Sequence, residues 1–209
     1  MIETYGSTST QSSTVLEDPP SHFASLLASI TPHSLVSLAI RVRYKGNRHK
    51  EGTQDHQCSL IRPLKYGSFN ILYTVEFADG VKWLVRIPNP GGNGRFTLSN
   101  VRCLRSEVYT MAFLRCNTSI PIPETYDFDE TIDNEIGAPY VVMEFVEGLS
   151  VDELWFDHTG PTPLPVRRVR HILETLVQAM SELRKFQFDN IGSLQFEPDS
   201  ILNPANYYR

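Results

Sequence analysis

Two alternating segments joined by a tight turn constrain the fold of this chain more than any other feature. Asp79-Gly80 is a strong signal for a two-residue hairpin, because glycine adopts positive φ at little cost. On both sides of it large apolar residues occupy every second position, which is the period of a β-strand. These residues are Ile71, Tyr73, Val75 and Phe77 before the turn and Val81, Trp83, Val85 and Ile87 after it. The sequence therefore predicts an antiparallel strand pair within residues 67–88.

Arg86 is the unusual residue of this hairpin. It lies near the end of the second strand, on the face that it shares with Lys82 and Leu84, among bulky apolar neighbours. A cation in such surroundings is costly unless a partner compensates for the lost water. We therefore look for a carboxylate that could reach Arg86.

A helix predicted from Ser99 or Asn100 to about Cys116 supplies a candidate. Its apolar residues share one arc of the helical wheel, and Glu107 falls within that arc. Glu107 could lie at the edge of the stripe and extend into solvent, or it could meet a buried cation. The stripe consists of Leu104, Val108, Met111, Ala112 and Leu114.

Composition divides the chain into four parts. Residues 1–20 are rich in serine and threonine and are predicted to be a disordered tail. Residues 21–57 form a helical extension and a polar loop, with Thr31 as the N-cap of a helix that has proline at its first position. Residues 58–147 form a sheet domain, and residues 148–209 a linker followed by helices. The extension helix presents Leu35, Leu38, Ala39 and Val42 on one face.

Three more strands and a long helix complete the predicted elements. Cys58 to Lys65 is predicted to be a strand, with Pro63 at an edge or a bulge because proline cannot donate to the ladder. Thr125 to Asp129 is a short strand, and Tyr140 to Val146 is an apolar strand that suits a buried central position. The longest helix is expected over residues 166–188, with an apolar stripe along it.

Charge and cysteine content exclude several classes. The net charge is −5 and the basic residues are scattered, so we expect no nucleic-acid partner. Three cysteines without metal-ligand spacing favour a reducing compartment over a disulfide framework. No apolar segment approaches the length of a membrane span, so we expect no membrane association and a cytoplasmic location.

The order of these elements resembles the smaller lobe of a protein-kinase-like fold. The resemblance is closest to the fungal branch of the aminoglycoside phosphotransferase, or choline-kinase-like, family, and it covers residues 58–194. It implies an α+β fold, with an antiparallel sheet of about five strands plus one helix. N-terminal helices precede this lobe and the first helices of a larger lobe follow it. The resemblance rests on segments 67–70, 77–88, 105–107, 140–148 and 189–194.

The resemblance also implies a nucleotide site. The turn of Gly67, Ser68, Phe69 and Asn70 would lie over the phosphates. Arg86 would bind them and Glu107 would orient Arg86, although the family usually has lysine at this position. The backbone from Glu144 to Val146 would meet the edge of adenine. ATP is thus the implied cofactor.

The residues that such catalysis requires after the long helix are not found. Kinase-like transfer uses a His-x-Asp-type loop to orient the acceptor, and a later aspartate and an asparagine to hold Mg²⁺. None of the six histidines is followed by aspartate two positions later. The Asp127-Phe-Asp129 segment precedes the adenine-contacting strand and is interpreted as an acidic pair at a strand end. We therefore assign no catalytic and no metal-binding residue, and expect weak ATP binding without retained Mg²⁺.

Three hypotheses remain open from the sequence. The chain is a truncated family member that does not transfer phosphate on its own, or it is a fragment of an active ATP-dependent small-molecule phosphotransferase. The third hypothesis is a non-catalytic interaction module, which binds a protein partner or a second copy through the exposed face of helix 166–188.

Overall fold

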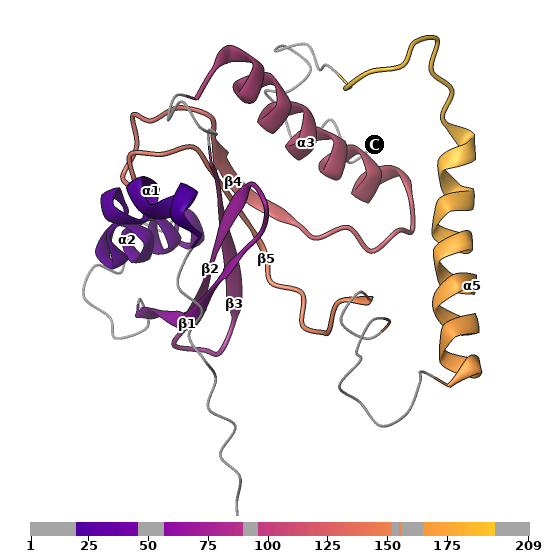
Figure 1. Ribbon diagram of the computed structural model, residues 1–209, viewed down its shortest axis with the longest axis horizontal. Coiled ribbons are helices and arrows are strands. Elements are labelled where there is room, and N and C mark those ends of the chain that lie inside the picture. Colours follow the sequence, from indigo (N-terminus) through magenta and orange to yellow (C-terminus); the bar gives the residue numbers. More distant parts are fainter. Residues whose placement is uncertain (1–19, 46–56, 90–95, 152–154, 156–164, 195–209) are drawn as a thin grey trace, which may run out of the picture.

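A computed structural model describes residues 20–45, 57–89, 96–151, 155 and 165–194, and Figure 1 shows its arrangement. The centre is a five-stranded sheet with strand order β1-β2-β3-β5-β4, in which every neighbouring pair is antiparallel. The strands are β1 (Cys58–Tyr66), β2 (Asn70–Phe77), β3 (Lys82–Pro88), β4 (Thr125–Asp129) and β5 (Tyr140–Glu144).

The predicted strand pair is confirmed as β2 and β3, but the turn is longer than the two residues predicted, because residues 78–81 separate Phe77 from Lys82. Gly80 has φ of 83°, and its N–H donates to the carbonyl of Phe77 at 2.9 Å, so this turn does need glycine. Val81 lies in the turn and is exposed, because β3 begins only at Lys82. β1 is an edge strand with a register shift between Ile61 and Lys65, which accommodates Pro63 as predicted.

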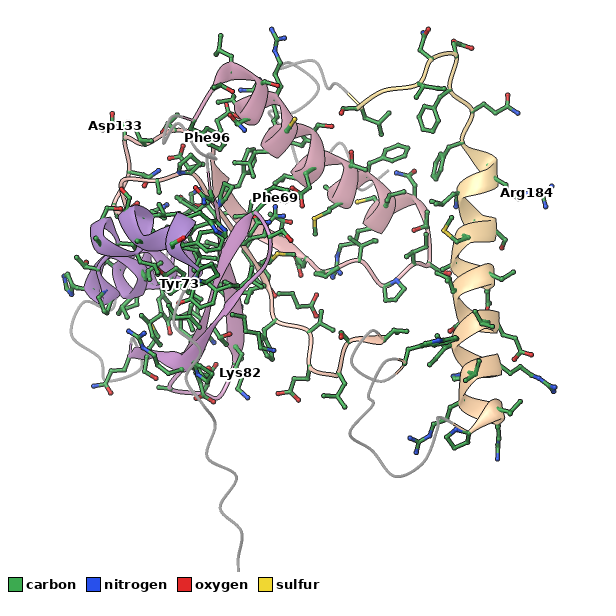
Figure 2. All side chains as sticks on the ribbon, in the orientation of Figure 1. Phe69, Tyr73, Lys82, Phe96, Asp133 and Arg184 are labelled. Atoms are coloured by element: carbon green, nitrogen blue, oxygen red, sulfur yellow. The ribbon has the colours of Figure 1, made fainter. Side chains whose placement is uncertain are left out.

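One face of the sheet is covered by the N-terminal helices. A short 3₁₀ helix, η1 (Ser21–Phe23), leads into α1 (Ala24–Ser29) and then α2 (Pro32–Arg43). The side chain of Thr31 accepts from the N–H of Ser34, which confirms the predicted cap. Figure 2 shows Tyr73 within the dense group of side chains between these helices and the sheet. The extension shares this core with the sheet: Phe23, Leu35, Leu38 and Ala39 pack with Ile71, Val75, Val85 and Val142.

The opposite face of the sheet carries α3 (Leu98–Asn117). Leu104 and Val108 pack there against Val141, with Phe128 and Met143 around them. The helix begins earlier than the sequence indicated, since Thr97 is the N-cap and forms a capping box with Asn100. The sheet is therefore the middle layer between α1–α2 and α3.

Helix α5 (Val166–Glu182) stands beside the C-terminal end of α3, away from the sheet (Figure 1). It continues as η3 (Leu183–Lys185), so the α-helix ends six residues before the predicted position 188 and is shorter than α3. The Glu182 carboxylate accepts from the N–H of Ser119 at 2.8 Å, and the rings of Phe113 and Phe186 lie 5.0 Å apart. Figure 2 shows Arg184 pointing outward from this end of the helix.

Two further expectations concern the termini and the membrane. The tail predicted at 1–20 lies outside the described residues except for its last position. Among those described, no single helix has the length and apolar character of a membrane span, and only the bent pair Ser21–Ser29 with Pro32–Arg43 satisfies the two criteria jointly. The domain boundaries at 20, 57 and 147 stay predictions.

Candidate functional site

Arg86 occupies the face of β3 that α3 covers. Its register partners are Leu72 on β2 and Val141 on β5, so it lies in the middle of the sheet. The alternate residues Val85 and Ile87 point into the core below α1 and α2, which turns Arg86 to the other side. Its side chain is only 15% exposed. The strand thus holds a cation at a largely buried position between two apolar layers.

Glu107 of α3 is the partner of this cation. Nη1 of Arg86 donates to the Glu107 carboxylate, as the second of the two alternatives for this residue required. Glu107 itself is not buried in the apolar stripe, because its side chain is 46% exposed. Leu104 and Val108 face the sheet, and Glu107 lies at the rim of the surface that they form. The pair therefore joins a buried guanidinium to a carboxylate that water reaches.

The other edge of the Arg86 guanidinium lacks a partner. Nε and Nη2 are both buried and have no hydrogen bond with any group that the structure describes. Elsewhere in the chain the same edge binds a carboxylate with two parallel bonds: Arg41 holds Glu135 in this way and Arg105 holds Glu130. Two parallel N–H donors on one edge of a guanidinium fit two oxygens of a carboxylate or a phosphate. In Arg86 the same edge carries no partner among the described residues.

The turn at 67–70 lies at the same end of the sheet as Arg86. The Gly67 N–H donates to the carbonyl of Asn70 at 2.9 Å, and the Asn89 N–H donates to the carbonyl of Phe69 at 2.8 Å. Asn70 pairs with Pro88, two residues along β3 from Arg86. Ser68 is exposed, and Phe69 at the tip of the turn is 75% exposed. The turn and the cation therefore lie near each other at this end of the sheet.

The predicted adenine-contacting segment begins at the opposite end. β5 ends at Glu144, two residues earlier than the sequence indicated, and Val146 follows outside the sheet with 63% exposure. The strand stops there because its neighbour β4 begins at Thr125, and Glu144 donates its N–H instead to the carbonyl of Glu124 at 2.8 Å. Glu144 pairs with Trp83, three residues from Arg86, which corresponds to roughly 10 Å along the strand. The turn, Arg86 and Glu144 thus follow one another along the direction of β3.

An ionic cluster at the end of α3 was not anticipated from the sequence. Arg115 donates to the carbonyl of Ile122 at 2.7 Å and to the Glu124 carboxylate at 3.4 Å, and it lies 3.7 Å from the Glu144 carboxylate. Burial, together with these two carboxylates, raises the pKa of Tyr126, while Arg115 opposes the shift. Arginine and glutamate are common on surfaces, so nothing in the sequence pattern indicated that these three converge.

The acidic segment at 127–129 is engaged in structural contacts. The Asp127 carboxylate accepts from the Tyr140 hydroxyl at 3.0 Å and from Nη2 of Arg41 at 3.4 Å. Asp129 accepts from the N–H of Thr131 at 2.8 Å. Within the described part of the chain, no group of three or more His, Cys, Asp or Glu side chains is arranged to hold a metal ion.

These features together define a class. An open antiparallel sheet, a cation on its third strand and a glutamate on the following helix are the arrangement of the small lobe of kinase-like phosphotransferases. The family model described as "Phosphotransferase enzyme family" matches residues 61–205, well over half of the chain. The chain therefore belongs to this phosphotransferase family, which confirms the resemblance.

Curated fungal relatives agree with this assignment. A subtelomeric hrmA-associated cluster protein of Aspergillus fumigatus is 31% identical over 147 residues, which are 70% of this chain and 26% of the relative. The mitochondrial protein named altered inheritance of mitochondria protein 9 is 26% identical in Yarrowia lipolytica, over 71% of this chain and 25% of the relative. Its namesake in Lachancea thermotolerans is 25% identical over 87% of this chain and 28% of the relative. The chain spans about a quarter of the length of the curated relatives it matches.

Proposed function

We propose that this chain is the nucleotide-covering part of an ATP-dependent small-molecule phosphotransferase, and that by itself it binds ATP weakly and transfers no phosphate. The observation that carries the proposal is the unpartnered edge of Arg86, formed by the buried Nε and Nη2. Leaving two donors buried without a partner costs free energy. A phosphate oxygen pair at this edge would remove that cost, which gives a physical reason for binding.

Each predicted residue has a defined role in this proposal. The backbone of Gly67 to Asn70 covers the phosphates, and Arg86 binds their oxygens through Nε and Nη2. Glu107 orients Arg86 through Nη1, on the side of the guanidinium away from the free edge. The backbone of Glu144 to Val146 meets the adenine edge. ATP, when bound, supplies the phosphoryl group to be transferred.

The absence of turnover follows from the residue types present. No histidine of the sequence starts a His-x-Asp segment, so no group is assigned to orient an acceptor hydroxyl. Without carboxylates to hold Mg²⁺, the charge on the β- and γ-phosphates is neutralised by Arg86 alone among the assigned residues. We therefore expect binding to be weak and Mg²⁺ to enter only as a complex with ATP.

Titration of the purified chain 1–209 with ATP tests the proposal. We expect saturable binding in the millimolar range by calorimetry, no release of ADP, and loss of binding in Arg86→Met. Arg105→Met is the matched control. It removes a guanidinium whose Nε and Nη2 bind the Glu130 carboxylate, and this pair lies away from the proposed site. Absence of saturable binding in the wild type, or equal binding by Arg86→Met, would overturn the proposal. Sustained ADP release by the wild type would overturn the claim of inactivity.

The fragment hypothesis makes a different prediction. If the active enzyme contains this sequence as one part, the transcript read beyond the codon of Arg209 should continue in frame and encode a His-x-Asp-type segment. An immediate stop codon would contradict it. The chain covers only about a quarter of each relative, which is the reason to sequence the transcript beyond this codon.

Helix α5 favours a second candidate function, the binding of another copy of the chain. Its apolar residues form a surface that the described residues do not cover, and such surfaces promote association. The exposed fractions run from 47% to 76% for Leu173, Leu176, Met180, Val177 and Val166. We expect a concentration-dependent dimer by sedimentation, reduced in Leu176→Glu but not in the exposed control Thr175→Glu. A wild-type monomer at high concentration would contradict this candidate.

Location is a further part of the proposal. We propose that the chain resides in the cytoplasm, on the basis of its composition. Several relatives are named as mitochondrial proteins, so mitochondria are the competing location. Cell fractionation with the endogenous, untagged chain distinguishes the two.

A further inference from the structure

We propose that Arg115 is a positioning residue of the nucleotide site. It fixes the end of β5, where the adenine-contacting backbone begins, to the end of α3, the helix that carries Glu107. This inference rests on the proposed function for its link to ATP. Its structural part concerns only the conformation of residues 144–147 and can be tested separately.

The first step is the position of the Arg115 guanidinium. It lies in the last turn of α3 and contacts three separate points of the chain. Nη1 donates to the carbonyl of Ile122 at 2.7 Å, Nη2 donates to the Glu124 carboxylate at 3.4 Å, and the Glu144 carboxylate lies 3.7 Å from Nη1. One side chain thus joins the helix, the connection into β4 and the end of β5.

The second step is the reciprocal bonding between Glu124 and Glu144. The Glu144 N–H donates to the Glu124 carbonyl at 2.8 Å, and the Glu124 N–H donates to the Glu144 carboxylate at 3.0 Å. This arrangement brings two carboxylates to the same guanidinium. Without a cation between them, their like charges would favour rotation of one side chain toward water. Arg115 therefore keeps the Glu144 carboxylate on the Glu124 N–H.

The third step is the dependence of the following segment on Glu144. β5 ends at this residue, and residues 145–147 have no regular strand or helix structure. The path of this segment therefore starts from the orientation of Glu144. A second support stands beside it, since Trp83 pairs with Glu144 in register and stacks on Tyr126 with ring centroids 4.3 Å apart. The aromatic stack supports the strand, whereas Arg115 links it to α3.

The fourth step connects the two ends of the site. Glu107 precedes Arg115 by about two turns on the same helix. A displacement of α3 would therefore change both the partner of Arg86 and the anchor of Glu144. Through Arg115, the position of α3 determines the conformation of both the phosphate-binding part and the adenine-binding part of the proposed site.

The experiment compares Arg115→Ala with the matched control Arg105→Ala in chain 1–209. Both substitutions remove an arginine of α3 that is paired with a glutamate of the sheet region, but Arg105 binds Glu130, away from Glu144. Hydrogen exchange of peptides that cover 142–147 is the first readout, and ATP affinity is the second. In Arg115→Ala we expect faster exchange than in wild type, and an ATP affinity at least about fivefold weaker than that of wild type. In Arg105→Ala we expect both quantities to stay near wild type. Arg115→Lys, which keeps the charge, should restore part of both.

A double-mutant comparison tests whether Arg115 acts through Glu144. In the background of Glu144→Gln, Arg115→Ala should change exchange at 142–147 much less than it does in the wild type, because the two changes remove one interaction. Full additivity, or equal exchange in Arg115→Ala and Arg105→Ala, would overturn the inference. If the wild type binds no ATP, the proposed function fails, while hydrogen exchange still decides the positioning role. If ATP binds and Arg115→Ala leaves its affinity unchanged, the link to the nucleotide site is wrong.

Discussion

Arg86 and Glu107 form an ion pair whose two members lie in different environments. The Arg86 side chain is 15% exposed and the Glu107 side chain 46%, while the bond between them uses only Nη1 of the guanidinium. Nε and Nη2 remain buried without a partner among the described residues. The pair therefore satisfies one edge of the cation and leaves the other edge without a partner, and this asymmetry leads to two predictions.

Replacement of Arg86 by methionine should leave stability unchanged or raise it. Methionine fills similar space among Leu72, Val141 and their neighbours and removes two unpartnered donors. We expect the free energy of unfolding to stay within about 1 kcal/mol of wild type or to rise, although ATP binding is lost. Urea unfolding followed by circular dichroism measures the difference. A loss above about 3 kcal/mol would show instead that the whole guanidinium is satisfied in the native chain.

Replacement of Glu107 by alanine should have a moderate effect. A fully buried pair loses about 3–5 kcal/mol when one partner is removed, and an exposed pair loses under about 1 kcal/mol. Since only Arg86 is largely buried, we expect a loss of about 1–2 kcal/mol. Urea unfolding of Glu107→Ala and Glu107→Gln measures it, with Arg102→Ala on the exposed side of α3 as the control. A loss as small as that of the control would show that the pair does not hold Arg86.

The shared core predicts that the N-terminal helices are required for stability. Leu38 of α2 is fully buried against the sheet, so Leu38→Ala should lower the free energy of unfolding by about 2–5 kcal/mol. The matched control is Leu176→Ala on α5, where the side chain is 55% exposed and the expected change is under about 0.5 kcal/mol. Thermal or urea unfolding distinguishes the two. Equal effects would mean that α2 contributes no core to the sheet domain.

Tyr140 predicts a loss of stability in alkali. Burial and the neighbouring Asp127 carboxylate raise the pKa of its phenol, against the opposing effect of Arg41. Burial also raises the pKa of Tyr73 to about 12. Because the folded chain keeps these protons after the unfolded chain has released them, their contribution is complete below about pH 10 and decreases as pH rises above that value.

Substitution of Tyr140 isolates its share of the loss of stability in alkali. Above pH 10 each group adds a decrease of up to about 1.4 kcal/mol per pH unit, and Tyr140→Phe should make the slope shallower by that amount. At neutral pH the same variant should lose about 1–2 kcal/mol, because Asp127 and Arg41 lose their hydroxyl partner. Unfolding at a series of pH values measures both, and an identical slope in Tyr140→Phe would contradict the prediction.

Local patterns in the sequence were sufficient for most elements of the fold. The alternation around Asp79-Gly80 predicted β2 and β3, Pro63 predicted either an edge strand or a bulge, and Thr31-Pro32 predicted the start of α2. Boundaries were less accurate where the signal was unusual. Thr97 was missed as a cap because asparagine, not glutamate or glutamine, completes its capping box. β5 ends before Val146, at the level where its antiparallel neighbour β4 begins, which no local pattern records.

The candidate site was predictable in part. The positions of Arg86 and Glu107 followed from periodicity and from the resemblance to the family, and the ion pair between them is present. The sequence left the exposure of Glu107 open, because a helical wheel gives the direction of a side chain but not where the neighbouring sheet ends. The cluster of Arg115, Glu124 and Glu144 was missed entirely, since its members come from α3, the connection into β4, and β5, and carry no shared spacing.

The sequence by itself determined the strands, the helices and the family, because these depend on residue order and on periodic contacts between near neighbours. Only the tertiary structure decided that one edge of Arg86 is satisfied and the other is not, and that α3 is joined to Glu144 through Arg115. The physical reason is that burial and long-range pairing depend on how the layers pack. Residues that are distant in sequence then determine whether a charge meets water, a carboxylate or neither.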